Sequence, residues 1–190
     1  MIYGEKTMEE TAALDTATRM CAAARTAPKA TGIDKIVTLV LMGEEKDQLA
    51  DKMDEIYLRK FGKTEGHYVR DAKGVRKSDA IVLIGVEKNY LGLPNCAFCG
   101  FKNCGANAKA GGRCVFDGIN LGIAIGSAVS VAADSRVDSR VLFSAGKAAE
   151  EMNYIDGKDI IWEAIPISIY GKSPFFDRDK DRPIRPRRDI

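Results

Sequence analysis

Hydrophobic and polar positions along the first part of the chain follow a helical period. From Ala13 to Ala24 the apolar side chains recur every three or four residues, which predicts an amphipathic helix. Thr7 and Glu10 have the spacing of a capping box, so we expect this helix to begin there. Pro28 disfavours helical geometry in the residue before it, so we expect the helix to end just before this proline.

Uninterrupted apolar runs further along the chain predict buried strands. Residues 35–41 are rich in β-branched side chains, and residues 80–86 form a second run of the same kind. A third run, residues 160–169, contains Pro166, which has no N–H for a strand ladder. We therefore expect this third strand to lie at an edge of the sheet or to end at the proline.

Three further helices are expected around these strands. One covers about residues 44–60, with acids in its first turn and Gly62 just beyond its end. A second begins near Asp117, whose side chain can cap it. This helix carries a small residue at every fourth position, at Gly118, Gly122, Gly126 and Ser130. Such a ridge lets another backbone approach closely, which indicates the core or a subunit interface. The last helix covers roughly residues 139–152.

Size and composition narrow the class of protein. A chain of 190 residues with mixed helices and strands fits one α/β domain, residues 1–190, in which a sheet lies between helices. The net charge of +2 is too small to indicate nucleic-acid or membrane binding as the main activity. The apolar run 118–133 is shorter than the span of about 18 residues that a membrane helix needs. The first ten residues lack the apolar core of a signal peptide, so we expect a cytoplasmic protein.

Four of the five cysteines lie in one short stretch, and they carry the candidate chemistry. Cys96 and Cys99 have two residues between them, a spacing that presents two thiolates to one metal centre. Four residues separate Cys99 from Cys104, and nine separate Cys104 from Cys114. Four soft ligands within one loop, residues 95–115, can enclose an iron–sulfur cluster or a zinc ion.

The surrounding residues favour the cluster over the zinc ion. Zinc ribbons usually pair two short Cys-x-x-Cys knuckles, whereas the second pair here is wide. Four glycines in the loop let backbone N–H groups approach cluster sulfurs. The loop has Lys102, Lys109 and Arg113 but no acid, and cations stabilise an anionic cluster. A structural zinc site stays open as the alternative, because it would tolerate the same cations.

The remaining candidate residues have simpler explanations. Disulfides are the weakest interpretation of the cysteine stretch, since nothing in the sequence indicates an oxidising compartment. Cys21 sits apart on an apolar helical face, as a packed core thiol would. His67 is the single histidine, which excludes a multi-histidine metal site, and its polar surroundings predict an exposed loop. Residues 171–190 are rich in Pro, Arg and Asp and are expected to form an extended tail.

The chain resembles a family of small "ferredoxin domain-containing" proteins of anaerobic bacteria and archaea. The segments that carry this resemblance are residues 23–29, the four-cysteine block, residues 121–130 and residues 173–178. The block is also similar to the opening of four-iron domains in corrinoid proteins and electron-transport subunits, although there the fourth cysteine lies further away. The resemblance implies a cluster, most simply of the 4Fe-4S type.

A fainter resemblance links both ends of the chain to FMN-dependent nitroreductases. Residues 23–30 are similar to the Ala-Ala-x-x-Ala-Pro-Ser turn of that family, and residues 165–178 are similar to its ending. The resemblance implies an α+β helix/sheet/helix sandwich with an inserted four-cysteine loop. It would also place Pro28 and Lys29 beside an FMN at a dimer interface, with Arg178 among the basic residues that hold the phosphate. The Arg-Arg-Ser segment of that family is missing.

Three functions remain open on these grounds. The first is an iron–sulfur electron-transfer or redox protein, an oxidoreductase if it is an enzyme, with FMN as a further cofactor. The second is a non-enzymatic protein whose cysteine loop is a structural zinc knuckle that serves assembly or partner binding. The third is a metal sensor or cluster carrier. No residue stands out as a general acid or base. We expect a homodimer whose tail crosses the partner, anchored at its start by Phe175 and Phe176.

Overall fold

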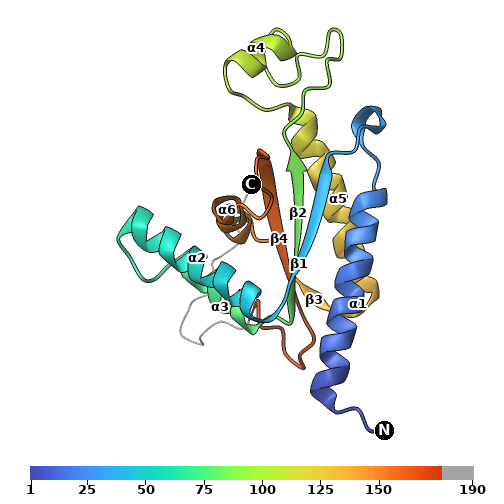
Figure 1. Cartoon of the computed structure of the whole chain (residues 1–190), viewed down its shortest axis with the longest axis vertical. Coiled ribbons are helices and arrows are strands. Elements are labelled where there is room, and N and C mark those ends of the chain that lie inside the picture. The colour runs from blue at the N-terminus through green and yellow to red at the C-terminus, as the bar shows by residue number, and fades with distance from the viewer. Residues whose placement is uncertain (177–190) are drawn as a thin grey trace, which may run out of the picture.

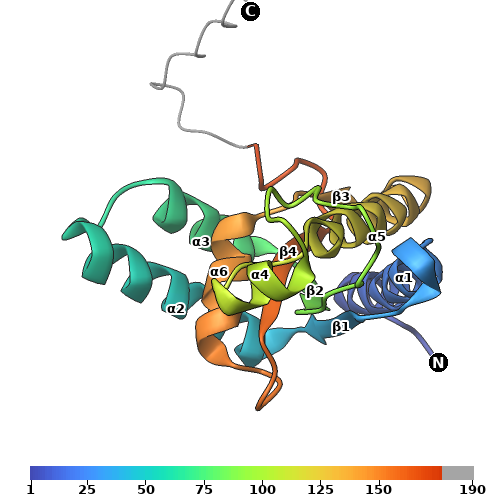
Figure 2. The same cartoon turned by 90° about the horizontal axis from the view of Figure 1, so that it is seen from above.

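The computed structural model describes residues 1–176 and shows a helix/sheet/helix sandwich, as the sequence predicts (Figures 1 and 2). Its elements in chain order are α1 (Glu5–Thr26), the 3-10 turn η1 (Ala30–Gly32), β1 (Ile36–Leu41), α2 (Gly43–Phe61), α3 (His67–Lys77), β2 (Ala80–Glu87), α4 (Cys104–Lys109), α5 (Val115–Asp134), β3 (Asp138–Ser139), α6 (Phe143–Met152) and β4 (Ile160–Ser168).

The four strands form one antiparallel sheet in the order β1-β2-β4-β3. The strand β2 lies inside this sheet, and Leu83 faces Leu39 on one neighbour and Ala164 on the other. All residues of β2 except the last, Glu87, are buried. This is the burial expected of a continuous apolar run that is covered on both faces.

Helices cover both faces of the sheet (Figure 2). On one face α1 and α5 bury Met20 and Leu121 against strand residues such as Val82. On the other face α2, α3 and α6 form a second apolar cluster that contains Met53. Gly146 lets α6 lie directly against β4, because a Cβ at this position would collide with the backbone oxygen of Trp162. The two apolar clusters contain no residue from 88 to 114.

Two helix starts differ from the sequence-based expectation. The helix α1 begins at Glu5 after Gly4, with no side-chain cap, so the predicted capping box at Thr7 is wrong. The amide of Met8 donates to the Gly4 oxygen at 3.2 Å, so the helical bonds already include the residues before Thr7. The helix α5 begins at Val115 with Cys114 as its N-cap, and Asp117 lies inside its first turn.

The predicted edge position of Pro166 is also wrong, since β4 pairs with β2 on one side and β3 on the other. The oxygen of Pro166 accepts from the Arg140 amide on the β3 side. In an antiparallel strand the nitrogen and the oxygen of one residue point to the same side. The missing N–H of Pro166 therefore faces the side where β3 has already ended at Ser139, and the pairing with β2 loses no hydrogen bond.

The sequence pattern missed one helix and lengthened another. His67 was expected in a loop but is the first residue of α3, exposed and in ring contact with Tyr57, Tyr68 and Phe143. The helix α6 begins at Phe143 rather than near residue 139, because the chain first forms the short strand β3.

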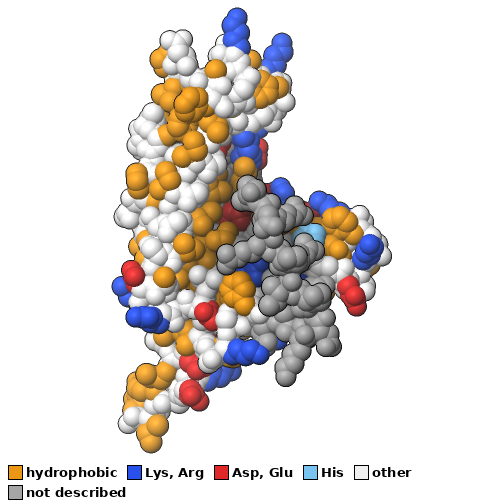
Figure 3. All heavy atoms as spheres, turned by 180° about the vertical axis from the view of Figure 1, so that it is seen from behind, with side chains coloured by type: hydrophobic (Ala, Val, Ile, Leu, Met, Phe, Trp, Pro, Cys, Tyr) orange, Lys and Arg blue, Asp and Glu red, His pale blue; other side chains and the backbone are white. Residues whose placement is uncertain are grey.

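The helix α5 combines a buried face with an exposed apolar face. Among the described residues it is the one helix long and apolar enough to cross a membrane by length and composition, with a mean hydropathy of 1.6. It packs on α1 and β2, and 33% of its apolar 18-residue stretch is buried. The exposed face carries Gly118, Gly122 and Gly126 with Ile119 and Ile123. Hydrophobic side chains are spread along this side of the molecule (Figure 3).

The described chain ends shortly after β4. Phe175 is buried and lies 3.5 Å from the position of a Cβ on Gly74 in α3. Arg140 donates to the Phe175 oxygen at 3.2 Å and lies 5.0 Å from the centre of the exposed Phe176 ring. The start of the predicted tail is therefore held on the body. Residues 177–190, which include Arg178, lie outside the described residues.

Candidate metal centre

Residues 88–114, here called the cysteine lobe, project from one end of the sandwich between β2 and α5 (Figure 1). Their secondary structure is limited to the six-residue helix α4. The lobe therefore depends on turns, caps and contacts with the body for its shape.

All four predicted ligands line one cavity of about 280 Å³ in the lobe. Cys114 is buried, and Cys96, Cys99 and Cys104 are partly buried. In the described part of the chain, no three His, Cys, Asp or Glu side chains are grouped closely enough to share one metal ion. Four thiolates in one zinc site would have sulfurs about 3.8 Å apart, given zinc–sulfur bonds of about 2.3 Å. A cubane cluster differs from a zinc ion in that each cysteine sulfur binds a different iron, so its ligands lie further apart.

The turn that carries Cys96 and Cys99 has an unusual backbone. Asn95 and Ala97 adopt φ angles of 56° and 46°, and Gly100 adopts 80°. The left-handed region costs a residue with a Cβ on the order of 1 kcal/mol. The Gly100 amide donates to the Ala97 oxygen at 2.9 Å and closes the turn. Cys96 and Cys99, the two cysteines of this turn, both line the cavity.

Two asparagines shape the second half of the lobe. Asn103 caps α4, its Oδ1 accepting from the Ala106 amide at 2.8 Å, so Cys104 follows directly at the start of the helix. Asn107 is 1% exposed, and its Nδ2 donates to the Arg113 oxygen at 2.8 Å. A side chain at position 112 would collide with Asn107, which explains Gly112. These two asparagines therefore help to position Cys104 and Cys114, which both line the cavity, although no metal motif includes them.

Aromatic and polar contacts fasten the lobe to the body. The Tyr90 hydroxyl donates to the Gly112 oxygen at 2.6 Å, and the Asn89 amide donates to Asp117 Oδ2 at 3.2 Å. Burial raises the pKa of the Asp117 carboxyl, although the Asn89 amide opposes this shift. Asp159, the residue directly before β4 in the chain, forms ion pairs with both Lys88 and Arg113. The lobe is therefore anchored at both of its ends.

The charge of the lobe is one-sided. It contains Lys88, Lys102, Lys109 and Arg113 and no acidic residue. Lys88 and Arg113 are paired with Asp159, whereas Lys102, which lines the cavity, and Lys109, the last residue of α4, are exposed. Two uncompensated cations lower the energy of an anion held between the cysteines.

Cys21 lies apart from the other four cysteines, and all five cysteines are free in the structure. Cys21 is partly buried on α1, far along the chain from the lobe, and burial raises the pKa of its thiol. A raised pKa favours the neutral thiol, which suits a packing role and not ligation.

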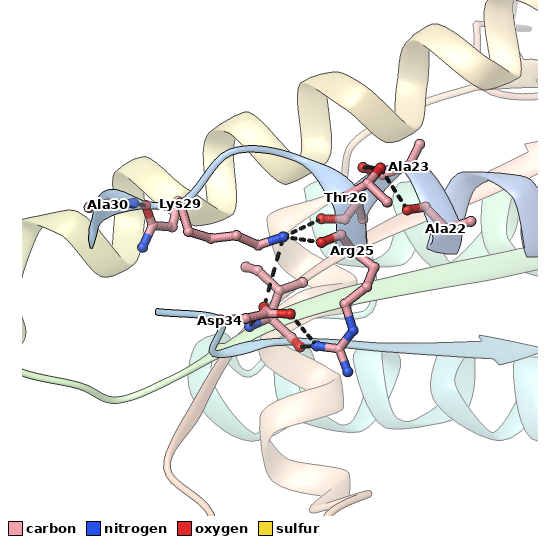
Figure 4. A network of polar contacts seen from close by, with 10 residues as sticks. Ala22, Ala23, Arg25, Thr26, Lys29, Ala30 and Asp34 are labelled. Carbon is pink, nitrogen blue, oxygen red and sulfur yellow. Dashed lines mark hydrogen bonds and ion pairs between the residues drawn. The ribbon is translucent and has the colours of Figure 1, made fainter. Parts of the chain in front are cut away.

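Figure 4 shows the turn after α1, which was expected to contact FMN. The Lys29 side chain is 6% exposed, and its ammonium donates to the oxygens of Ala24 and Arg25 at the end of α1. The same ammonium lies 3.8 Å from Asp34, which also binds the Arg25 guanidinium at 2.8 Å. Both cations of the turn are therefore engaged by protein oxygens. Lys29 would have to leave these partners to contact a flavin, and its role at a flavin stays a prediction.

The rest of the predicted flavin site is only partly described. Pro28 is exposed directly after α1. The amide of Ala30 donates to Asn120 Oδ1 of α5 at 3.0 Å, so this turn touches the helix that follows the lobe. Arg178 lies outside the described residues.

Comparisons with known proteins identify relatives of this chain. A family model described as "Uncharacterized protein containing a ferredoxin domain" (DUF2148) matches residues 110–178. An uncharacterized protein of Archaeoglobus fulgidus is 39% identical over 189 residues, which cover 94% of this chain and 98% of the relative.

Solved structures of nitroreductases share the fold. A putative nitroreductase from Desulfovibrio desulfuricans in complex with FMN is similar with a TM-score of 0.54 and 15% identity, over 90% of this chain and 80% of that one. A nitroreductase from Desulfitobacterium hafniense with bound FMN has a TM-score of 0.54 and 13% identity, over 97% of this chain and 88% of that one. At these identities the likeness concerns the fold. The chain has a nitroreductase-like fold with a cysteine lobe and belongs to the family of uncharacterized proteins containing a ferredoxin domain.

Proposed function

We propose that the chain is an iron–sulfur redox protein that holds one cluster, of the 4Fe-4S type, between Cys96, Cys99, Cys104 and Cys114. The family and the fold both support a redox role. When bound, the cluster supplies reversible one-electron transfer. The chain's own residues hold it, exclude part of the solvent and set its electrostatic surroundings.

The single observation that carries this proposal is the arrangement of the four cysteines around one cavity of about 280 Å³. A structural zinc ion, the alternative, would draw the four sulfurs to about 3.8 Å from one another. Asn103 caps the helix that Cys104 begins, and Asn107 binds the Arg113 oxygen next to Cys114, so side-chain contacts of the lobe oppose such a contraction.

The charge of the lobe supports the same choice. A cubane with four thiolates is an anion and gains a further negative charge on reduction. The exposed Lys102 and Lys109 stabilise the reduced state more than the oxidised state, so they raise the reduction potential. A zinc site has no second oxidation state that such cations could favour.

Anaerobic purification of the full chain tests the proposal. We expect brown protein with a broad visible absorbance. It should contain iron and acid-labile sulfide in equal amounts, about four of each per chain for a cubane cluster. Stoichiometric zinc without sulfide, from cells supplied with iron, would establish the zinc knuckle instead. A cluster that leaves rapidly to an apo acceptor protein would favour the carrier function over electron transfer.

FMN is the second candidate cofactor, because two nitroreductases of the same fold contain it. The proposed flavin site uses Pro28, Lys29 and Arg178, and Lys29 would first have to leave the end of α1 and Asp34. Titration of FMN with flavin fluorescence as the readout tests this directly. Lack of quenching with FMN well above micromolar concentration would leave the fold without the flavin.

We also propose a cytoplasmic homodimer that contacts an unidentified redox partner and binds neither nucleic acid nor membrane. The exposed face of α5 supports the dimer, because its glycines leave the backbone open next to Ile119 and Ile123. Phe175 and Phe176 would direct the C-terminal tail across the partner subunit. Light scattering of the full chain should give twice the chain mass of 20.7 kDa.

A further inference from the structure

The outer surface of the cysteine lobe combines positive charge with an exposed aromatic ring. Phe98 is 72% exposed. Lys102 and Lys109 are also exposed, and neither side chain forms an ion pair or a hydrogen bond with another described residue. In Figure 3 the lobe lies at the upper end of the molecule, where Lys or Arg side chains and hydrophobic side chains project. Aromatic residues are enriched where proteins contact one another, so this surface has an anchor for a partner protein.

The charge of the chain is divided between the lobe and the body. The lobe carries four cations and no acid, whereas the whole chain has a net charge of +2, so everything outside the lobe is net negative. Two of the four cations, Lys88 and Arg113, are compensated by Asp159. The other two, Lys102 and Lys109, leave the lobe positive. Such a division of charge directs an approaching acidic protein to the lobe and away from the body.

This surface also gives access to the cysteine cavity. Cys96, Cys99 and Cys104 are partly exposed, whereas Cys114, at the start of α5, is only 8% exposed. Lys102 lines the cavity and is exposed, so it belongs both to the cavity wall and to the outer surface. A protein that docks on the lobe therefore lies next to three of the four proposed ligands. Electron transfer between two proteins requires such proximity of their redox centres.

The small number of free cations distinguishes among anionic partners. A nucleic acid presents a regular row of phosphates, and its affinity comes from several Lys or Arg contacts made together. Only Lys102 and Lys109 are uncompensated on the lobe, which is too few for such a row. Two cations beside an exposed ring suit a small protein interface, in which a few charge pairs orient the partner and an apolar contact holds it.

We propose that the surface formed by Phe98, Lys102 and Lys109 docks an acidic electron-transfer protein. The redox nature of this partner rests on the proposed iron–sulfur function, whereas its negative charge follows from the residues of the lobe. The interface is small and short-lived, because redox encounters typically bury less than about 1,200 Å². Its affinity depends on ionic strength, because the two lysines act through exposed charge.

Soluble cytochrome b5 and cytochrome c are matched probes, because both are small haem proteins that carry one electron, and the first is acidic and the second basic. Each is labelled with nitrogen-15 and titrated with the full chain, prepared anaerobically, with amide chemical shifts as the readout. At an ionic strength of about 0.01 M, cytochrome b5 should bind about tenfold or more tightly than cytochrome c. At about 0.1 M its binding should weaken severalfold, because the Debye length falls from about 30 Å to about 10 Å. Equal binding of the two probes, or no binding of cytochrome b5, would overturn the proposal.

Two double variants of equal charge locate the surface. Lys102→Glu combined with Lys109→Glu reverses both free cations of the lobe and should abolish the preference for cytochrome b5. Lys60→Glu combined with Lys63→Glu makes the same chemical change at exposed positions around the end of α2, and the preference should persist. The two variants have the same net charge, so only the position of the change differs. A preference that survives in the lobe variant would contradict the proposed surface.

A second pair of variants tests the aromatic anchor. Phe98→Ala removes the exposed ring together with its stacking on Phe116. Phe116→Ala removes the same stacking but keeps the ring of Phe98. Phe98→Ala should therefore weaken the binding of cytochrome b5 severalfold more than Phe116→Ala does. Equal binding by the two variants would remove Phe98 from the docking surface.

Iron and sulfide assays of the same samples separate this inference from the proposed function. Protein without a cluster that still prefers cytochrome b5 through Lys102 and Lys109 would uphold the acidic docking surface and contradict the iron–sulfur function. Protein with a full cluster but without the preference would overturn the docking surface and leave the iron–sulfur function standing.

Discussion

Phe98, between the first two cysteines, stacks on Phe116 in the first turn of α5, with ring centroids 6.0 Å apart and planes inclined by 20°. Phe98 remains 72% exposed, so its ring serves more to hold the loop than to fill a core. The contact joins the start of the cysteine stretch to the helix that follows its end. It therefore helps to keep Cys96 and Cys99 near Cys114.

This stacking makes a prediction about cluster retention. Phe116→Ala should remove a contact worth about 0.5–1.5 kcal/mol and loosen the Cys96–Cys99 turn. We expect faster loss of the visible absorbance in air, with little change in the melting temperature of the body. The control Phe176→Ala removes an exposed ring that lies over Arg140, and it should leave the rate unchanged.

The ligand assignment makes the sharpest prediction. Alanine in place of Cys96, Cys99, Cys104 or Cys114 should lower the iron and sulfide content severalfold or more, because a cluster iron loses its protein ligand. Cys21→Ala is the matched control, and its metal content should equal that of the parent chain. Full iron content in any of the four variants would remove that cysteine from the ligand set.

Charge reversal on the lobe should change the reduction potential without changing the ligands. Lys102→Glu combined with Lys109→Glu should lower the potential by about 10–50 mV, because anions near the cluster disfavour its reduced state. Redox titration at low ionic strength measures the shift. Lys60→Glu combined with Lys63→Glu, at the far end of α2, should shift the potential much less. Equal shifts in both double variants would contradict a cluster in the lobe.

The raised pKa of Glu163 makes a prediction about stability against pH. A carboxyl whose pKa is higher in the folded chain binds its proton more tightly there, so its effect on stability is most favourable in acid. Stability is lost as the pH rises through the folded-state pKa. The difference in unfolding free energy between Glu163→Gln and the parent should thus be small in acid and should grow in favour of the variant toward neutral pH. Denaturant unfolding at several pH values measures it, and a constant difference would contradict the prediction.

The exposed glycines of α5 give a test of the proposed dimer. A charged side chain at Gly122 meets nothing within the subunit, because a Cβ there has no neighbour within 4 Å. Gly122→Glu should therefore leave the chain folded but convert the dimer into a monomer by light scattering. Gln48→Glu adds the same charge to exposed α2 on the opposite face, and it should stay dimeric.

The sequence was sufficient for the buried strands and the long helices because their patterns are local. The apolar run of β2 and the period of α1 depend on residues that are neighbours in the chain. Pro166 was misplaced because its tolerance depends on where β3 ends, which is a contact between distant segments. The helix α3 was missed because its short polar sequence conceals the buried positions of Tyr68, Ala72 and Val75.

The gathering of the four cysteines around one cavity was predictable for a similar reason, since they lie within one loop. The cavity that Arg113 and Glu163 line was not predictable, because these residues are fifty positions apart and neither belongs to a motif. The role of Lys29 also depended on tertiary contacts. Its ammonium reaches backward to the end of α1 and across to Asp34, and neither contact follows from the resemblance that suggested a flavin.

The cysteine lobe contributes nothing to either apolar cluster of the body. The energy that folds the sandwich is therefore separable from the energy that binds the metal centre. If the lobe holds the proposed cluster, a newly made chain would reach its body fold with empty thiols and receive the cluster afterwards. A shortage of iron would then leave a folded protein without its cofactor rather than a misfolded one.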